Sequence, residues 1–366
     1  MEFKYEMPTS VYFGKNVVRE HKEVFQKVGK RALIVTGHHS AKKNGAYEDV
    51  AAVLSAIGTE FVLFDEVEEN PSLDTVERGA QRGREARADF VVGIGGGSPM
   101  DAAKAIALFL KNPQIDKNTV FNSGKLESIP VIAVATTSGT GSEVTPYSIV
   151  TSDAEKTKKN LGQVIFPAAA FLDSKYTYEL PYEITVHTAI DAFTHLAEGY
   201  LNTNSTCLSD MYAEKGFSLF AGCFENLLQK DLNEDFRDRI MMASTLAGIE
   251  IAQTGTSLPH GMGYALTYFK GLPHGIANGV LIPEYLKSFQ NTDKLVRMLS
   301  LLKLEGLYEL ERIFHQLIRV EFCFSQEEIL LYSKEFMSNK VKLKNHTEAV
   351  MLDDIVRIYE GALAFL

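Results

Sequence analysis

Four side chains with the chemistry of metal ligands lie in the second half of the sequence. Asp191 and His195 are four residues apart, so a helix there places both on one face. His260 and His274 each follow a proline and precede a glycine. One carboxylate and three imidazoles suit a divalent transition metal and leave coordination room for a further oxygen. The four residues are a predicted metal site.

Each histidine taken alone has a more ordinary explanation, because most histidines in helical domains are packed or solvent-facing residues. The repeated Pro-His-Gly setting distinguishes His260 and His274 from the histidines that we interpret as structural, which are His187, His315 and His346. A ligating imidazole usually has its other ring nitrogen held by a polar group. Glu198 is a candidate for that role, and a salt bridge on the helix surface is an equal alternative.

A glycine-rich turn in the first half has the form of a phosphate-binding site. Gly95, Gly96, Gly97 and Ser98 follow an apolar run and precede a helix-like segment that begins with Pro99. Such a turn lets a pyrophosphate approach the backbone, and the free N–H groups of the helix favour an anion. The spacing differs from G-x-G-x-x-G, and a tight turn without a ligand remains an alternative.

A second polar loop follows the apolar run 129–136. It contains hydroxyl side chains separated by glycines, namely Thr136, Thr137, Ser138 and Thr140. Open parallel sheets bind ligands beyond the carboxyl ends of their strands, so these hydroxyls are candidates for cofactor contact. A flexible surface loop is the alternative for this segment taken alone.

The residues after the first apolar run bear on nucleotide preference. An NAD-selective site commonly has an acid there for the ribose 2′-hydroxyl, but this chain has Gly37. Glycine, Ser40 and a lysine such as Lys43 can accept a 2′-phosphate, which favours NADP(H) over NAD(H). The lysines could instead form a solvated helix face.

The elements that must position these residues differ between the two halves. Short, nearly continuous apolar runs in the first half predict buried parallel strands, with helix-like stretches between them. The strands are expected at 31–36, 60–65, 89–94, 129–136 and 168–172, with an edge strand at 8–14, and the helices at 41–57, 72–87 and 99–111.

From about residue 183 the apolar spacing becomes helical. Examples of the expected helices are 183–201, 207–229, 236–252, 278–290, 308–320 and 326–337. We therefore predict an α/β dinucleotide-binding domain with a Rossmann-like sheet over residues 1–180, and an all-α metal and substrate domain over residues 181–366, with the metal in a cleft between them.

Composition excludes several classes of function. The formal net charge of −10 provides no basic surface for nucleic acid, and no apolar run reaches the roughly 18 residues that suggest a membrane span. The N-terminus does not have the pattern of a secretory signal. The three cysteines, Cys207, Cys223 and Cys323, are expected to be buried free thiols of a cytoplasmic protein.

Four ordered motifs carry a resemblance to a known family. GGGSPMDAAKAIA, TTSGTGSEVT, DAFTHLAEGY and LPHGMGYALTYFKGLPHGIANGVLIP resemble the iron-containing (group III) alcohol dehydrogenases, over at least residues 30–290. The resemblance implies a dehydroquinate synthase-like two-domain architecture, a homodimer, and a metal, commonly Fe(II) and in some members zinc. It also implies that the four residues of the predicted metal site, Asp191, His195, His260 and His274, bind that metal.

The resemblance extends to the cofactor. It implies that the glycine turn and the threonine loop hold a nicotinamide nucleotide, and it adds contacts that spacing alone does not give. The residues implied in this way are Asn70, Gly96, Gly97, Ser98, Asp101, Thr137, Ser138 and Lys159. Lys159 lies in a Lys-Thr-Lys-Lys run that allows more than one alignment.

The chain departs from the family at one position. Many members have a histidine four residues after the one matching His260, near the nicotinamide, whereas this chain has Tyr264. We therefore treat Tyr264 as a catalytic candidate whose hydroxyl substitutes in proton transfer. The expected reaction is metal-assisted hydride transfer between NAD(P)(H) and a short or medium primary alcohol, diol or aldehyde.

Three other functions remain as alternatives. Glycerol dehydrogenase and dehydroquinate synthase share the scaffold but differ in their metal ligands. A nucleotide-binding scaffold without catalysis would be expected to lose metal ligands first, and a metal-storage protein would not need the glycine loops.

Overall fold

The computed structural model describes residues 2–152 and 157–365, which form two compact units. The first is Met7–Leu180, and the second is Met1–Glu6 with Pro181–Leu366. The domains predicted above assign residues 1–6 to the first half. They belong with the second unit because Tyr5 shares a hydroxyl hydrogen bond with Tyr212 (2.9 Å), and the Glu6 amide donates to Gln253 (3.2 Å).

The first unit contains a six-stranded sheet in which every strand pair is parallel. The strand order is β1-β8-β5-β4-β2-β3, so the expected edge strand near residue 10 and the strand near 170 are both confirmed. The strands are β1 (Ser10–Phe13), β2 (Arg31–Gly37), β3 (Glu60–Val67), β4 (Phe90–Gly95), β5 (Val131–Ala135) and β8 (Ala169–Leu172).

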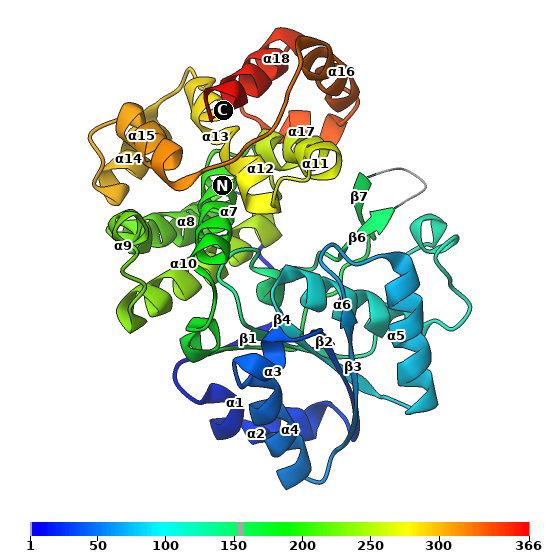
Figure 1. Cartoon of the computed structure of the whole chain (residues 1–366). Helices are drawn as coiled ribbons and strands as arrows, with labels where there is room; N and C mark the ends of the chain where they lie inside the picture. The colour runs from blue at the N-terminus through cyan, green and yellow to red at the C-terminus, as the bar shows by residue number, and fades with distance from the viewer. Residues whose placement is uncertain (1, 153–156, 366) are drawn as a thin grey trace. The chain divides into compact units, whose positions relative to one another are not determined.

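Helices cover both faces of this sheet (Figure 1). Alternate side chains of one strand face opposite layers, so Leu33 packs in one apolar cluster and Ile34 in the other. This explains why the central strands read as continuous apolar runs. The helices are α1 (Val17–Glu20), α2 (Lys22–Val28), α3 (Ser40–Lys43), α4 (Ala46–Ala56), α5 (Leu73–Glu85) and α6 (Gly97–Lys111).

Two details of this unit differ from the sequence-based expectation. The helix expected at 41–57 is divided into α3 and α4 because Gly45 adopts a left-handed conformation with φ of 82°. An antiparallel hairpin of β6 (Ile149–Ser152) and β7 (Thr157–Asn160) was not predicted. β7 is entirely polar and β6 has only two adjacent apolar residues, Ile149 and Val150, so neither strand shows the apolar alternation by which strands are recognised.

The second unit is helical, as expected. The predicted helix 207–229 is broken near Gly222, whose φ is 86°, and 278–290 is also two helices. The helices are α7 (Tyr182–Tyr200), α8 (Cys207–Phe220), α9 (Cys223–Gln229), α10 (Glu234–Thr254), α11 (Leu258–Lys270), α12 (His274–Gly279), α13 (Ile282–Lys287), α14 (Asp293–Leu302), α15 (Leu307–Leu317), α16 (Gln326–Phe336), α17 (Lys340–Asn345) and α18 (Leu352–Gly361).

An aromatic cluster fixes the orientation of α7. The ring of Phe193 meets Phe217, Phe220, Phe224 and Phe314 edge-on, at centroid distances of 5.5 to 6.1 Å. Edge-to-face pairs of this kind contribute roughly 0.5–1.5 kcal/mol each beyond their burial. Since Phe193 lies between Asp191 and His195 in sequence, its anchoring turns those two side chains toward the opposite face of the helix.

The cysteine expectation is correct only in part. All three thiols are free, but only Cys223 is buried, and Cys207 and Cys323 are exposed. Among the described residues, none of the helices is long and apolar enough to cross a membrane.

Candidate metal centre and cofactor loops

The first pair of predicted ligands lies on α7. Asp191 and His195 are one helical turn apart and are 3% and 5% exposed, respectively. A carboxylate and an imidazole at this depth need polar or ionic partners, because burying them alone is costly. The partners come from α11 and α12.

His260 enters the cluster from the first turn of α11. Pro259 precedes it at the helix start, where its missing N–H costs no hydrogen bond. His260 is 3% exposed, and its Nε2 lies 3.5 Å from Asp191 Oδ1. The rings of His195 and His260 are stacked, with centroids 4.2 Å apart.

His274 begins α12, and the glycine after it allows the approach to α7. A methyl group at Gly275 would collide with the carbonyl oxygen of His187 and would lie 2.9 Å from Cβ of Asp191. The close packing brings His274 Nε2 to 3.8 Å from Asp191 Oδ1. The amide of Asn278, one turn later, donates to Asp191 and also lies beside His274 Nε2, both at 3.3 Å.

The resulting cluster has the dimensions of a metal site. One ligand atom each from Asp191, His195 and His260 lies within 4.8 Å of the others, and all three residues are buried. His274 is less enclosed, with its side chain 28% exposed. The structure thus brings together the four residues singled out from the sequence, of which three are buried and His274 is partly exposed.

The electrostatics of the cluster favour a cation. Burial acts to raise the pKa of Asp191, but the neighbouring His195, His274 and His260 outweigh it and hold that pKa far below its usual range. Burial acts to lower the pKa of His260, yet Glu198 and Asp191 raise it to about 9. Both shifts mean that positive charge between Asp191 and His260 is stabilised, so the residues fit a divalent metal.

Tyr264 lies one turn after His260 on α11. Its ring is stacked with that of His274, with centroids 6.0 Å apart and planes 24° apart. Tyr264 occupies the position at which the resemblance led us to expect a histidine. Its ring is therefore beside a predicted ligand, His274.

In the first unit, the two polar loops lie side by side. β4 pairs with β5 so that Gly95 is opposite Ala135, and the Thr136 amide donates to the Gly95 carbonyl at 2.9 Å. Gly95 has a φ of 153°, which favours glycine, and a methyl group on Gly96 would lie 2.8 Å from Thr137 Oγ1. The glycines are thus required where the turn at the start of α6 meets the threonine loop.

The candidate cofactor residues of these loops have different surroundings. Gly97 packs against Thr140, where an added methyl group would lie 2.8 Å from the threonine methyl. The hydroxyl of Ser138 is buried and has no hydrogen-bond partner among the described residues. An unsatisfied buried hydroxyl is uncommon, so Ser138 fits a site that receives a polar ligand.

Asp101 has a mainly internal role in the structure. Its carboxylate accepts hydrogen bonds from Ser142 Oγ (2.5 Å) and from the Ile149 amide (3.0 Å). The fully buried ammonium of Lys104 donates to Ser142 Oγ (2.8 Å) and to the Tyr147 carbonyl (2.7 Å). The pair therefore ties α6 to the loop that follows β5.

Asn70 and Lys159 flank the same region. The backbone N–H of Asn70 donates to Ser98 Oγ at 3.1 Å, and its backbone carbonyl accepts from the Thr151 hydroxyl at 2.7 Å. Asn70 has a φ of 58°, an uncommon conformation outside glycine. The ammonium of Lys159, on β7, lies 4.4 Å from the centroid of the Phe121 ring.

The residues predicted to set nucleotide preference follow β2. Gly37 ends the strand, and Ser40 and Lys43 are exposed on the short helix α3. Lys42 forms an ion pair with Asp65 at 2.7 Å. Since β2 is the parallel neighbour of β4, this segment and the glycine turn both lie at the carboxyl ends of the strands.

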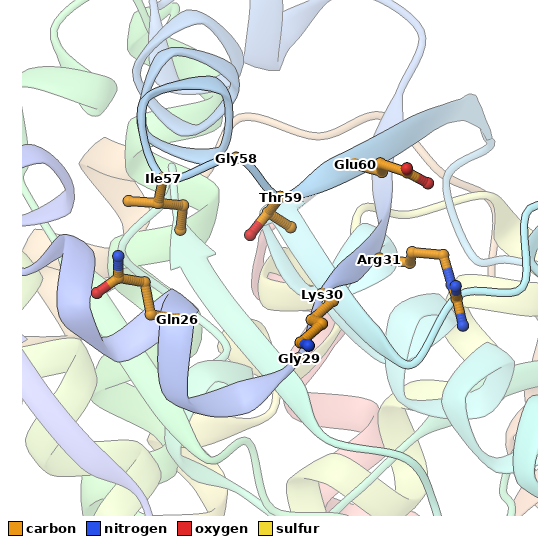
Figure 2. Close-up of a pocket in the computed structure, with 8 residues that line it drawn as sticks. All are labelled: Gln26, Gly29, Lys30, Arg31, Ile57, Gly58, Thr59 and Glu60. Atoms are coloured by element: carbon orange, nitrogen blue, oxygen red, sulfur yellow. The ribbon is translucent and has the colours of Figure 1, made fainter.

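A cavity of about 410 Å³ lies at the amino ends of β2 and β3, opposite to the end that carries the cofactor loops (Figure 2). Its walls come from the start of β2 and β3 and from α2. They are formed by Gln26, Gly29, Lys30, Arg31, Ile57, Gly58, Thr59 and Glu60. None of the residues singled out from the sequence borders it, so it is separate from the candidate cofactor loops.

Three residues near the two clusters were missed or left undecided by the sequence. Glu198 is fully buried and contacts His260, so the surface salt bridge is excluded. Asn278 and Lys104 were not singled out. Asn278 occupies the i+4 position from His274, a spacing that could have identified it, whereas nothing in the sequence indicates that Lys104 is buried.

The chain matches one family over most of its length. Residues 8–174 match the profile of the iron-containing alcohol dehydrogenases, and residues 185–312 match the C-terminal domain of that family. It is 30% identical to an NADPH-dependent butanol dehydrogenase of Clostridium saccharobutylicum, covering 81% of this chain and 78% of that protein. It is also 30% identical to lactaldehyde reductase of Escherichia coli, covering 76% and 73%, respectively.

A solved structure supports the same conclusion. The iron-containing alcohol dehydrogenase of Thermotoga maritima has 37% identity and a TM-score of 0.90, covering 99% of this chain and 100% of that one. The chain therefore belongs to the iron-containing alcohol dehydrogenase family. It is an NAD(P)-linked alcohol dehydrogenase or aldehyde reductase, and this decides the choice between the functions left open above.

Proposed function

We propose that Asp191, His195, His260 and His274 hold one divalent metal ion, Fe(II) or alternatively Zn(II). The observation that carries the proposal is the buried cluster, in which three of these residues offer ligand atoms within 4.8 Å of one another and His274 lies beside Asp191. Imidazole and carboxylate ligands suit both metals, so the ligand set does not choose between them.

The cofactor belongs in the first unit under this proposal. The backbone of Gly96 and Gly97 at the start of α6 binds the pyrophosphate, as helix N-termini favour anions. The remaining contacts are proposed for Asn70, Ser98, Thr136, Thr137, Ser138, Thr140 and Lys159. The buried, unsatisfied hydroxyl of Ser138 is the best structural support among them, and for Asp101 we propose a role in holding the loop.

We propose a preference for NADP(H) over NAD(H). Gly37 provides no carboxylate to repel a 2′-phosphate, and Ser40 and Lys43 are exposed next to it. Lys42 is engaged by Asp65, so Lys43 is the cation that we assign to the phosphate.

The proposed chemistry divides the work between the bound groups and the protein. When bound, a divalent metal would polarise the oxygen of an alcohol or aldehyde, and the nicotinamide would supply or accept the hydride. Asp191 contributes a negative charge that balances the cation, and the three imidazoles fix its position. Tyr264 is the proposed proton carrier, because it has a hydroxyl group and its ring is stacked against that of His274.

The substrate proposed is a short or medium primary alcohol, a diol or the matching aldehyde. The two compact units act as the dinucleotide and metal domains of a homodimer, on the strength of the family resemblance. Three free thiols support a reducing compartment such as the cytoplasm.

A matched assay tests this function. The protein is purified under low oxygen without chelator, its metal content is measured, and oxidation of NADPH and NADH is followed with a panel of short aldehydes before and after Fe(II) or Zn(II) addition. Metal-dependent oxidation of NADPH, faster than that of NADH, is expected. A preference for NADH would overturn only the nucleotide assignment, whereas failure to bind either metal would overturn the metal site.

A further inference from the structure

We propose that Glu198 is the positioning residue of the metal centre. It fixes the orientation of the His260 ring through Nδ1, so that Nε2 points toward the other predicted ligands. This inference rests on the metal site proposed above and adds a residue that does not itself touch the metal, substrate or cofactor.

The contacts of Glu198 are unusually complete for a carboxylate. Oε1 accepts from His260 Nδ1 at 2.5 Å and from the His260 amide at 3.2 Å, and Oε2 accepts from the Ser257 amide at 2.5 Å. Glu198 is 0% exposed, so no water competes for these donors. Two free N–H groups at the start of α11 and one ring nitrogen therefore converge on a single side chain.

The consequence for His260 follows from the chemistry of imidazole. A neutral ring has one N–H and one lone pair. In the neutral form that binds a metal, the carboxylate at Nδ1 keeps the N–H on that nitrogen and leaves the lone pair on Nε2, the ring nitrogen that faces Asp191 Oδ1 at 3.5 Å. Two electron-rich atoms facing one another at this distance are stabilised when a cation lies beside both. A carboxylate behind a ligating histidine also makes the ring a stronger ligand.

The same contacts fix the position of the helix that carries His260. Because the carboxylate holds the backbone amides of Ser257 and His260 as well as the ring, it sets both where α11 starts and how the ring is turned. A role restricted to the helix start would alter stability but would leave the ligand environment unchanged. Metal affinity and a spectroscopic signature separate the two roles.

The chain offers a matched control in Glu250. This residue of α10 is also 0% exposed, and a methyl group added to Gly199 of α7 would lie 2.7 Å from its carboxyl carbon. Neither of its oxygens has a hydrogen-bond partner among the described residues. Glu250→Gln removes a buried carboxyl from the neighbouring turn without touching a predicted ligand.

The experiment compares the wild type with Glu198→Gln, Glu198→Asp and Glu250→Gln in the full-length chain. Zn(II) affinity is measured by competition with a chelator, and the visible absorption of Co(II)-loaded protein reports the ligand geometry. We expect Glu198→Gln to bind Zn(II) roughly 10- to 100-fold more weakly, with shifted Co(II) bands. Glu250→Gln should match the wild type in both measurements.

Glu198→Asp keeps the charge but withdraws it by one methylene, so it should fall between the wild type and Glu198→Gln, and it serves if the glutamine variant does not fold. Wild-type affinity and unchanged Co(II) bands in a folded Glu198 variant would overturn the inference while leaving the metal site intact. If the wild type itself binds no metal, the proposed function fails first. An equal loss in Glu250→Gln would also overturn the inference, because any buried carboxyl would then have the same effect.

Discussion

At the scale of single residues, the four predicted metal ligands differ in how deeply they are buried. Asp191, His195 and His260 are almost fully enclosed, whereas His274 has a side chain 28% exposed. Replacing an enclosed ligand removes packing as well as chemistry. His274 is therefore the residue at which the contribution to metal binding can be measured with the smallest structural disturbance.

We predict that His274→Gln lowers metal affinity and reduces kcat/KM by about 100-fold or more, a loss typical of disturbed metal sites. The control is His315→Gln, because His315 stacks on Phe365 and contacts none of the predicted ligands. Metal content after dialysis and steady-state rates with NADPH provide the measurement. Equal metal content in the two variants would argue against His274 as a ligand.

Tyr264 is expected to act on the proton and not on the metal. Tyr264→Phe should therefore keep full metal content and lower kcat by roughly 100-fold, in the range of general acid–base contributions. Tyr264→His should restore most of the rate and shift the pH profile toward neutral pH, since imidazole titrates near 6.5. An unchanged rate in Tyr264→Phe would remove the residue from the catalytic set.

At the scale of elements, the sequence predicted what depends on periodicity and missed what depends on close packing. The parallel strands were identified because Leu33 and Ile34 face two apolar layers and give a continuous run. α11 was absent from the predicted helices, although Pro259 marks its start. Four glycines lie from residue 261 to 275, and the two inside the helix, Gly261 and Gly263, weaken its helical pattern.

The same glycines allow the site to form, which the sequence could not reveal. Gly275 is needed because α12 lies directly against the backbone of α7 at His187 and Asp191. The four ligands were predictable because their residue types are distinctive. The groups that hold them, Glu198 and Asn278, were not, because a buried and an exposed polar residue look alike in sequence.

Gly275→Ala is predicted to force α12 away from α7, with a loss of about 1–3 kcal/mol in unfolding free energy and weaker metal binding. Gly124→Ala is the control, since a methyl group there meets nothing within 4 Å. Denaturant unfolding and metal titration of both variants check the prediction. Wild-type metal affinity in Gly275→Ala would show that α12 tolerates the shift.

Lys104 joins α6 to the loop after β5, so its loss should disturb the nucleotide site. Lys104→Met leaves Asp101 buried without its cation, and breaking such a pair costs roughly 3–5 kcal/mol. We expect weaker NADPH binding, measured by nucleotide fluorescence, with unchanged metal content. Adding Asp101→Asn to the same chain should recover part of the stability, and no recovery would mean that the two residues act independently.

At the scale of the whole molecule, the metal ion and the nucleotide are each assigned to a different compact unit. Every proposed metal ligand belongs to the Pro181–Leu366 part of one unit, and every proposed cofactor contact belongs to Met7–Leu180. Stabilisation by a ligand acts on the residues that bind it, and a ligand present at 100 times its Kd contributes about 2.7 kcal/mol.

We therefore predict that chelation speeds hydrogen exchange chiefly in α7, α11 and α12, and that NADPH slows it chiefly in the segments 95–101 and 136–142. Exchange measured by mass spectrometry on the intact chain, with and without each ligand, makes the comparison. Protection of α11 by NADPH alone, in metal-free protein, would contradict this separation.

The chain junction between Leu180 and Pro181 has an evolutionary consequence. Recombination there would transfer the complete set of ligands, with the glutamate, the asparagine and the glycine that hold them, as one inherited block. A chimera joined at that point could acquire a new nucleotide preference from one parent while retaining the metal chemistry of the other. Substitutions that change the nucleotide preference and substitutions that change the metal chemistry can thus evolve independently within a single gene.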